Sequence, residues 1–516
     1  MGLVAVLLVC VGLRAWVAAR SPVVAIDATL YLKAARQLQQ EGASAIRRTP
    51  LHPGYPAAVA GVEAVLRAGG APEGPRTWDA AGQIVAMLFA AGATAAAWWL
   101  ASQVFDARVA TLGIGLFTVT REWTTVGADA LSDTMAIAFQ MLCLALALKA
   151  EGLLRRRPRA ACGLLAAAGL AAGAGYLARV EAILALATVL VLLAAAVLRK
   201  RAKWHTALLG GLASVAVAAA AVAPYIAQVG MVTPKHEISD YLRPLHAHAA
   251  GPALPLASIQ QTTPYITADE FIGALHVSVA ILVGLWVMTW AGVRVLRLRL
   301  PRAVRVFPSV SGGTLILTVL GLYLAAMMLR HLRWGTIGSR YFMLPSLLLA
   351  SLAGAAVVIL SRWWRLGAER LGRPGPRLRH ACWLLYAALA IGLLLHASRP
   401  LHVQAVCYRR AGEYVRSISE PGDRIVVDRR RVVHYADREG VLNHLRRRLN
   451  RPQKQRQLIR WSRKKGFRYV VLVNRADRPA RLSEPARERV GAVLLHRLAC
   501  EDRGLVVEIY RIERPR

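Results

Sequence analysis

The chain has 516 residues, of which 56% are hydrophobic, and its mean hydropathy is +0.40. A water-soluble protein of this length needs a polar surface over its core, so the composition excludes the soluble class and indicates a polytopic membrane protein. The formal net charge of +37 would also suit a nucleic-acid-binding protein, but the arginines fall mostly between apolar segments. That placement is typical of a membrane topology signal, and we expect no nucleic-acid partner.

The first apolar segment, residues 3–19, is long enough to cross a bilayer. We interpret it as a retained span, because no basic region precedes it and no small-residue cleavage site is clear. Apolar segments of about spanning length recur along the chain and predict about eleven transmembrane helices. They are 3–19, 79–103, 108–120, 129–150, 161–178, 180–197, 205–228, 270–293, 309–328, 340–361 and 380–397.

Basic residues cluster in alternate loops between these segments. The clusters are Arg155, Arg156, Arg157 and Arg159; Arg199, Lys200, Arg201 and Lys203; Arg294, Arg297, Arg299, Arg302 and Arg305; and Arg362, Arg365, Arg370 and Arg373. The positive-inside rule places all four on the cytoplasmic side if the N-terminus is cytoplasmic. The sequence therefore predicts a multi-pass protein of the cytoplasmic (inner) membrane. Its expected outer parts are the first loop 20–78, with amphipathic helices, the loops 121–128 and 329–339, the long loop 229–269, and everything after 398.

The composition changes near residue 400, which separates a membrane domain, 1–398, from a C-terminal region, 399–516. The pattern there predicts a helix at 402–418, a turn at 420–423, strands at 424–428, 469–473 and 505–510, and helical segments between them. We expect a small extracytoplasmic α/β domain, without a nucleotide site, because no glycine-rich loop follows a strand. The six cysteines form no C-x-x-C motif, but Cys407 and Cys500 could pair in an oxidising compartment.

Ionisable residues gather at the predicted outer ends of the spans. Asp27 follows the first span, Asp129 and Asp133 surround the start of the fourth, Arg179 and Glu181 lie between the fifth and sixth, and Arg333, Arg340 and Tyr341 flank the start of the tenth. Ionisable residues at membrane depth are costly, and they usually mark function or tight pairing. Acids and bases are therefore predicted to meet at one face of the membrane.

Asp129 and Asp133 are four residues apart, so the pattern predicts that they share a helix face. Asp129 immediately precedes a helical run and could be only its N-cap. Asp133 lies one turn deeper in the span, where a capping role explains it less well.

The other charged residues also have structural alternatives. Arg179 and Glu181 could form a structural ion pair at a tight turn. Asp27 could cap the helix predicted over the next fourteen residues, 28–41. Arg333 and Arg340 could be anchors that reach lipid headgroups.

Together these groups suit glycosyl transfer from a lipid-linked sugar phosphate. An acceptor hydroxyl needs a general base, which a carboxylate at the membrane interface supplies. The leaving phosphate is already acidic and needs cationic stabilisation by Arg, Lys or a metal ion rather than a general acid. A divalent metal is allowed, although no set of ligands has a diagnostic pattern. In-line displacement at such a site inverts the anomeric centre.

The chain resembles the GT-C glycosyltransferases, in particular the bacterial branch related to protein mannosyltransferases and to the aminoarabinose transferase of lipid A. The resemblance rests on motifs that occur in the family's order within about residues 1–360. They are Asp27-Ala28-Thr29-Leu30-Tyr31, Arg48-Thr49-Pro50-Leu51-His52-Pro53, Leu131-Ser132-Asp133, Arg179-Val180-Glu181, and Gly338-Ser339-Arg340-Tyr341-Phe342-Met343-Leu344-Pro345.

The resemblance implies a polyprenyl-phosphate-linked sugar as the donor and the first outer-loop acid, Asp27, as the catalytic base. The family's second outer acid, assigned to metal or acceptor, corresponds to Asp133 or Asp129. The cations at the donor phosphate correspond to Arg340, Arg333 and Arg179, and further substrate-loop candidates are Tyr31, Arg48, His52, Glu181 and Tyr341. The family's mannosyltransferases often carry an Asp-Glu pair in the first loop, whereas Ala28 follows Asp27 here. This departure counts against a mechanism with adjacent acids and against a protein acceptor.

We therefore predict an inverting, polyprenyl-phosphate-dependent glycosyltransferase whose acceptor is a protein, a lipid or a glycan. The alternative is a transporter or flippase of lipid-linked or sugar substrates. Transporters usually show internal repeats and broken helices at the midplane, whereas no repeat is obvious here and the polar groups lie at the outer edge. A scaffold role would leave Asp27 and Arg340 unexplained.

Overall fold

The computed structural model describes residues 1–49, 51–232, 310–334, 343–370, 375–442, 452–476, 482, 484, 487, 491–500 and 504–513. The chain divides into two compact units. The first, which we call the membrane unit, comprises Met1–Trp16, Gln37–Ala58 and Ile84–Arg399. The second, which we call the C-terminal unit, comprises Val17–Arg36, Val59–Gln83 and Pro400–Arg516. The C-terminal region therefore forms one compact unit with two segments that lie mostly in the first predicted outer loop, 20–78.

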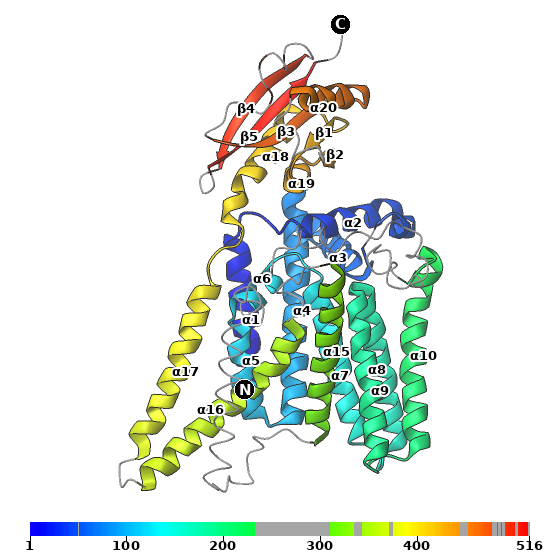
Figure 1. Ribbon diagram of the computed structural model, residues 1–516, viewed down its shortest axis with the longest axis vertical. Coiled ribbons are helices and arrows are strands. Elements are labelled where there is room, and N and C mark those ends of the chain that lie inside the picture. Colours follow the sequence, from blue (N-terminus) through cyan, green and yellow to red (C-terminus); the bar gives the residue numbers. More distant parts are fainter. Residues whose placement is uncertain are drawn as a thin grey trace. The chain divides into compact units, whose positions relative to one another are not determined.

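Up to residue 400, the described residues are almost entirely helical (Figure 1). The helices are α1 (Gly2–Arg20), α2 (Ala28–Glu41), η1 (Gly42–Arg47), α3 (Gly54–Ala68), α4 (Pro75–Val104), α5 (Ala107–Thr118), α6 (Arg121–Ala128), α7 (Asp133–Glu151), α8 (Pro158–Ala178), η2 (Val180–Ala182), α9 (Ile183–Leu198), α10 (Trp204–Val229), α15 (Val310–Trp334), α16 (Met343–Arg370) and α17 (Gly375–Ala397). Within the membrane unit, α8 packs between α7 and α10, and α5 packs against α16.

Six helical segments in the described part of the chain are long and apolar enough to cross a membrane. They are α1, α4, α7, α8, the segment Val180–Leu198 and α10, and shorter apolar helices occur at Ala107–Thr118, Ser311–Ala326, Met343–Ile359 and Trp383–Ala397. The predicted polytopic, mainly helical class is confirmed. The span predicted at 270–293 and nearly all of the loop 229–269 lie outside the described residues.

Close helix contacts in the membrane unit depend on small residues. A Cβ on Gly169 of α8 would lie 2.0 Å from the carbonyl oxygen of Ser214 on α10. A Cβ on Gly173, one turn later, would lie 2.8 Å from the Cβ of Ala221. Backbones this close are typical of membrane helices, where tight van der Waals contact replaces the hydrophobic effect as the driving force.

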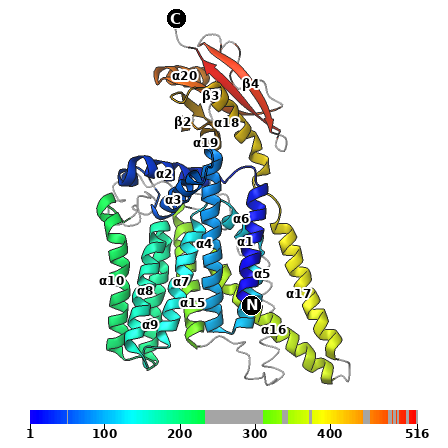
Figure 2. The ribbon, with the colours of Figure 1, turned by 180° about the vertical axis from the view of Figure 1, so that it is seen from behind.

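The C-terminal part of the second unit is an α/β fold (Figure 2). Its elements are η5 (Val403–Ala405), α18 (Val406–Ile418), β1 (Arg424–Val427), α19 (Arg430–Ala436), β2 (Glu439–Leu442), α20 (Pro452–Lys464), β3 (Phe467–Arg475), β4 (Ala492–Cys500) and β5 (Leu505–Ile512). The strand order is β2-β1-β3-β5-β4. Strand β1 is parallel to both of its neighbours, and β5 is antiparallel to both of its own.

Three of these strands, β1, β3 and β5, lie where the sequence predicts them, and two were missed. Strand β4 occupies an interval for which we expected only helix, and β2 lies in a short segment that begins with a charged residue. Both are edge strands of the sheet. Edge strands are partly exposed, so their apolar pattern is weaker than that of the central strands.

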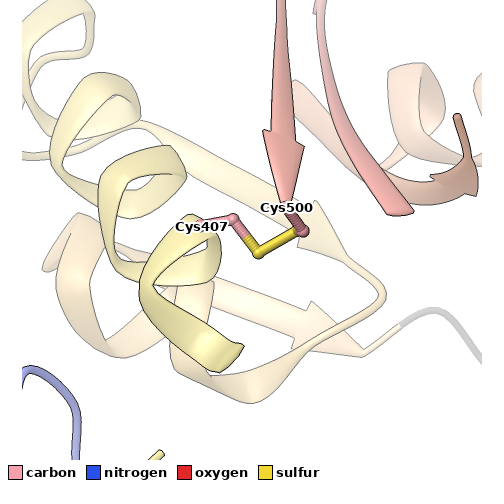
Figure 3. The surroundings of a disulfide bond; sticks show 2 residues. All are labelled: Cys407 and Cys500. Atoms are coloured by element: carbon pink, nitrogen blue, oxygen red, sulfur yellow. A yellow bond between two sulfur atoms is a disulfide. The ribbon is translucent and has the colours of Figure 1, made fainter. Parts of the chain in front are cut away.

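Cys407 on α18 and Cys500 at the end of β4 form a disulfide bond (Figure 3). Their Cα atoms are 5.2 Å apart, although 93 residues separate them in the sequence. The pairing that the sequence left open is thus present. It ties the first helix of the α/β fold to an edge strand.

Replacing both Cys407 and Cys500 by Ala is expected to destabilise the C-terminal unit by about 2–5 kcal/mol, because the bond closes a long loop in the unfolded chain. The urea midpoint of the full-length protein in detergent, measured by pulse proteolysis within 400–516, reports this change. Cys143→Ala is the control, because Cys143 is a buried free thiol of the membrane unit. Equal midpoints for the double variant and the control would mean that the bond contributes no stability.

Glu508 on β5 is fully buried in the C-terminal unit, forms an ion pair with Arg497 at 3.6 Å and accepts hydrogen bonds from two other side chains. They come from Asn474 Nδ2 at 3.0 Å and from Tyr510 Oη at 2.6 Å. Burial raises the pKa of Tyr510, and the Glu508 carboxylate raises it further. The tyrosine is therefore held protonated in the folded state.

This raised pKa predicts a loss of stability in alkali. The contribution of Tyr510 is fully present below the pKa of an unfolded tyrosine, about 10, and is lost as the pH rises through the higher folded pKa. We expect the urea midpoint to fall less steeply between pH 9 and 11 in Tyr510→Phe than in the wild type. Tyr414→Phe is the matched control and should keep the wild-type slope. A wild-type slope in Tyr510→Phe would contradict the prediction.

Candidate functional site

Asp133, Arg179 and Glu181 form a buried ion-pair cluster in the membrane unit. Arg179 Nη1 donates a hydrogen bond to Asp133 Oδ1 at 2.9 Å. Its Nη2 lies 3.3 Å from Glu181 Oε1, and its Nε lies 3.4 Å from Glu181 Oε2. Asp133 and Arg179 are 5% and 6% exposed. The ion pair between Arg179 and Glu181, which the sequence allowed as a structural alternative, is present, and the structure adds Asp133 to it.

The local fold places these three side chains at the ends of helices. Asp133 is the first residue of α7, and Arg179 follows α8 in an extended conformation (φ −157°, ψ 136°). The backbone then turns through the short helix η2, which contains Glu181 and places its side chain beside that of Arg179. Gly175 leaves room for this turn, because a Cβ at that position would lie only 3.0 Å from the Cβ of Ala182.

The cluster has one polar atom that its own members do not satisfy. Asp133 Oδ2 is buried and accepts no hydrogen bond within the described part of the chain. Buried carboxylate oxygens without a donor are rare in proteins, and each calls for an explanation. Two carboxylates face one guanidinium, so the three groups carry a formal charge of −1. This charge favours a hydroxyl donor at Asp133 over a phosphate at Arg179.

Asp129 does not share a helix face with Asp133, and that prediction is wrong. Asp129 follows α6 in an extended conformation (φ −103°, ψ 155°), and its N–H donates to the carbonyl of Thr125. Its Oδ1 accepts from the N–H of Ala130 at 3.1 Å. Ser132, not Asp129, is the N-cap residue of α7. Aspartate side chains that bond to nearby backbone compete with helix formation, which explains the break between α6 and α7.

Gln140 and Tyr323, which sequence reasoning missed, extend the cluster inside the membrane unit. Gln140 lies two turns beyond Asp133 on α7 and donates to the backbone carbonyl of Glu181 at 3.2 Å. It also hydrogen-bonds Tyr323 Oη on α15. Both side chains are buried. The sequence does contain a signal for this pair, because Gln140 is a polar residue inside an apolar span. Polar side chains at that depth usually form hydrogen bonds with other buried groups.

The two predicted loop residues Arg48 and His52 have different environments. Arg48 is 66% exposed and pairs with Glu41 at 3.2 Å. His52 is 2% exposed, and its ring centroid lies 5.3 Å from that of Tyr176 and 5.5 Å from that of Tyr225. Tyr176 lies in the last turn of α8, three residues before Arg179, so His52 packs against the same end of α8 that leads to Arg179. Arg48, in contrast, is a surface residue.

Asp27 and Tyr31 belong to the C-terminal unit. Asp27 is partly buried and directly precedes α2, whose bounds match the predicted helix 28–41. Its backbone carbonyl accepts from the N–H of Leu30 at 3.0 Å, and Tyr31 is 9% exposed. The predicted site residues are thus divided between the two units.

Two of the three donor-phosphate candidates cannot be placed with their side chains. Arg333 lies in the last turn of α15, and its side chain is outside the described part of the structure. Arg340 and its neighbour Tyr341 lie outside the described residues altogether. Only Arg179 has a described environment, and there it is engaged by two acids.

The described residues do not fit the divalent metal that the sequence allowed. Among them, no group of three or more His, Cys, Asp or Glu side chains is arranged to hold a metal ion. In the cluster itself, a guanidinium already joins the two carboxylates of Asp133 and Glu181. We therefore derive no step through a metal.

Comparison with known proteins finds relatives only in structure. No protein-family model matches the sequence, and no curated protein matches it. ArnT from Cupriavidus metallidurans, solved with undecaprenyl phosphate, aligns with a TM-score of 0.59 at 14% identity, over 98% of this chain and 97% of that one. The oligosaccharyltransferase of Archaeoglobus fulgidus, solved with a tethered acceptor peptide, aligns with a TM-score of 0.57 at 14% identity, over 91% and 68%.

The mycobacterial arabinofuranosyltransferase AftD aligns with a TM-score of 0.51 at 14% identity, over 99% of this chain and 41% of that one. At such low identity the likeness establishes the fold and leaves the substrates open. All three neighbours are GT-C glycosyltransferases. The chain therefore has the fold of the GT-C membrane glycosyltransferases.

Proposed function

We propose that the chain is an inverting glycosyltransferase that moves a sugar from a polyprenyl-phosphate carrier to an acceptor hydroxyl at the outer face of the cytoplasmic membrane. The observation that carries the proposal is the alignment with ArnT, which covers nearly the whole of both chains. The structure of ArnT was solved with a polyprenyl phosphate bound. The resemblance of the Asp27 and Arg340 motifs to the same family supports it independently.

In this mechanism Asp27 removes the proton from the acceptor hydroxyl as its oxygen attacks the anomeric carbon. The bond between that carbon and the phosphate oxygen breaks, and polyprenyl phosphate leaves with the electron pair. Arginine side chains, with Arg340 and Arg333 as the candidates, stabilise the charge that develops on the leaving phosphate. Attack opposite to the leaving group inverts the anomeric centre.

The buried acid Asp133 supplies a second function at the acceptor. Its Oδ1 is held by Arg179, and its Oδ2 is the buried oxygen that accepts no hydrogen bond among the described residues. A substrate hydroxyl would satisfy that oxygen and would be oriented by it. We therefore assign Arg179 to holding Asp133 rather than to the donor phosphate.

The orientation at the outer face draws on two observations. Basic residues occupy alternate loops, which by the positive-inside rule leaves the C-terminal domain outside the cytoplasm. The disulfide between Cys407 and Cys500 lies in that domain, and structural disulfides persist in oxidising compartments. Both favour an extracytoplasmic C-terminal domain.

The test is the release of polyprenyl phosphate by purified full-length protein from a mixed pool of lipid-linked sugars, followed by mass spectrometry. A glycosyltransferase releases polyprenyl phosphate from at least one donor, faster when an acceptor is present, and forms a product of inverted configuration. If the protein instead moves an intact lipid-linked sugar across the bilayer of proteoliposomes and releases polyprenyl phosphate from no donor, the transporter or flippase alternative is established.

A further inference from the structure

The segment Ser21–Val24, which leads to Asp27, is held by side chains of the C-terminal α/β fold. Arg409 Nη1 donates to the carbonyl of Pro22 at 2.8 Å. Arg431 Nε donates to the carbonyl of Val24 at 2.8 Å. The two pairs are separated by 387 and 407 positions in the sequence but lie in the same compact unit. Charged donors make the stronger hydrogen bonds, so both carbonyls are firmly positioned.

Two further hydrogen bonds join the segment to residues after 400, one to the α/β fold and one to Leu401 just before it. The N–H of Val24 donates to Tyr435 Oη at 3.2 Å, and the N–H of Leu401 donates to Ser21 Oγ at 2.8 Å. The Tyr435 hydroxyl in turn donates to Asp79 Oδ2 at 3.0 Å. Burial raises the pKa of Tyr435, and the Asp79 carboxylate raises it further, so the hydroxyl keeps the proton that this bond needs.

Apolar burial adds to these bonds. Val23 is 2% exposed and belongs to the hydrophobic core of the α/β fold, together with Tyr408, Val432 and Tyr435. The segment itself has no helix or strand that would set its backbone. Its conformation therefore depends on contacts made by the C-terminal fold.

The helix that follows Asp27 has a second attachment to the same fold. Arg36 of α2 forms an ion pair with Asp437, the residue that follows α19. Its guanidinium also lies over the ring of Trp78, 5.4 Å from the centroid. The chain is thus held both before and after Asp27.

We propose that the C-terminal domain positions Asp27 for catalysis, with Arg409, Arg431 and Tyr435 as positioning residues that act through the backbone of 21–24. The inference rests on the proposed function, because it takes Asp27 as the general base. The C-terminal α/β fold, which contributes no reacting group to the proposed mechanism, would then act in catalysis by holding the general base in place. A misplacement of about 1 Å in a reacting group can cost about a hundredfold in rate.

The test uses full-length protein with the substitutions Arg431→Met and Tyr435→Phe, assayed for release of polyprenyl phosphate. We expect kcat to fall by about tenfold to a hundredfold while the KM for the donor changes little, because the base is displaced and donor contacts remain. Arg431→Lys, which keeps a charged donor, should recover part of kcat. The matched control is Arg468→Met, because among the described residues the Arg468 guanidinium pairs with Asp423 at 3.0 Å and Glu420 at 3.6 Å and makes no bond to 21–24.

A second readout is independent of activity. Hydrogen exchange of the peptide that spans 21–30 should quicken in Arg431→Met and Tyr435→Phe but not in Arg468→Met, while the peptide that covers β3 keeps its protection in all three. Unchanged exchange at 21–30, or faster exchange with a wild-type kcat, would overturn the positioning role. If the wild type releases no polyprenyl phosphate from any donor, the proposed function fails, whereas the exchange result still decides whether the domain holds the segment.

Discussion

Asp27→Asn is expected to lower the rate of polyprenyl-phosphate release by about 10²–10⁴-fold, the usual contribution of a general base. Asparagine has nearly the same shape as aspartate but cannot accept the proton of the acceptor hydroxyl. The donor should still bind, because the substitution leaves the candidate phosphate contacts in place. Single-turnover release from radiolabelled donor, with binding measured separately, checks both statements.

The choice of asparagine separates catalysis from capping. Asp27 directly precedes α2, and asparagine is about as good an N-cap as aspartate. The matched control is Asp106→Asn, because Asp106 caps α5 by accepting from the N–H groups of Arg108 and Val109, both at 2.9 Å. Asp106→Asn should keep full activity. Normal turnover by Asp27→Asn would show that Asp27 is only a cap and that another residue is the base.

Arg179→Met is expected to destabilise the membrane unit by about 3–5 kcal/mol, because removing one partner of a buried ion pair leaves an uncompensated charge. Here Asp133 and Glu181 would both lose the guanidinium that joins them. The fall in melting temperature of the detergent-solubilised protein, followed by size-exclusion chromatography after heating, measures this effect.

Two further variants test the cause of that loss. Arg179→Met combined with Asp133→Asn should regain part of the stability, since it removes a buried negative charge. Arg48→Met should shift stability by less than about 1 kcal/mol, because exposed ion pairs contribute little and Arg48 is 66% exposed. An Arg179→Met variant as stable as Arg48→Met would mean that the cluster is not a structural ion pair.

The two variants that address the site report on different parts of the molecule. Asp27 lies in the C-terminal unit, and Arg179 lies in the membrane unit. A loss of turnover without a loss of stability is expected for the first, and a loss of stability for the second. The assignment of Asp133 to the acceptor can then be examined with Asp133→Asn alone, which keeps the shape of the side chain.

Hydropathy was sufficient to predict most of the helices. A helix that crosses lipid must satisfy its own backbone and present about twenty apolar residues, so each such span is recorded locally in the sequence. The helices α4, α8 and α10 lie within a few residues of their predicted bounds. The same reasoning located β1, β3 and β5, because central strands are rich in β-branched and aromatic residues.

Helical spacing gave a wrong prediction where a side chain bonds to the backbone beside it and ends the helix. The spacing of Asp129 and Asp133 predicts one helix face, but the Asp129 carboxylate bonds the N–H of Ala130 and ends the helical run. Hydropathy is blind to side chains that compete for backbone hydrogen bonds.

The sequence by itself determined the membrane class, most of the spans, the family resemblance and the residue types available for chemistry. Only the tertiary structure decided that Asp133 joins Arg179 and Glu181, that Cys407 bonds Cys500, and that the α/β fold holds the segment before Asp27. The physical reason is the range of the interactions. Spans follow from transfer of neighbouring residues into lipid, whereas these pairings depend on which distant elements pack together and exclude water.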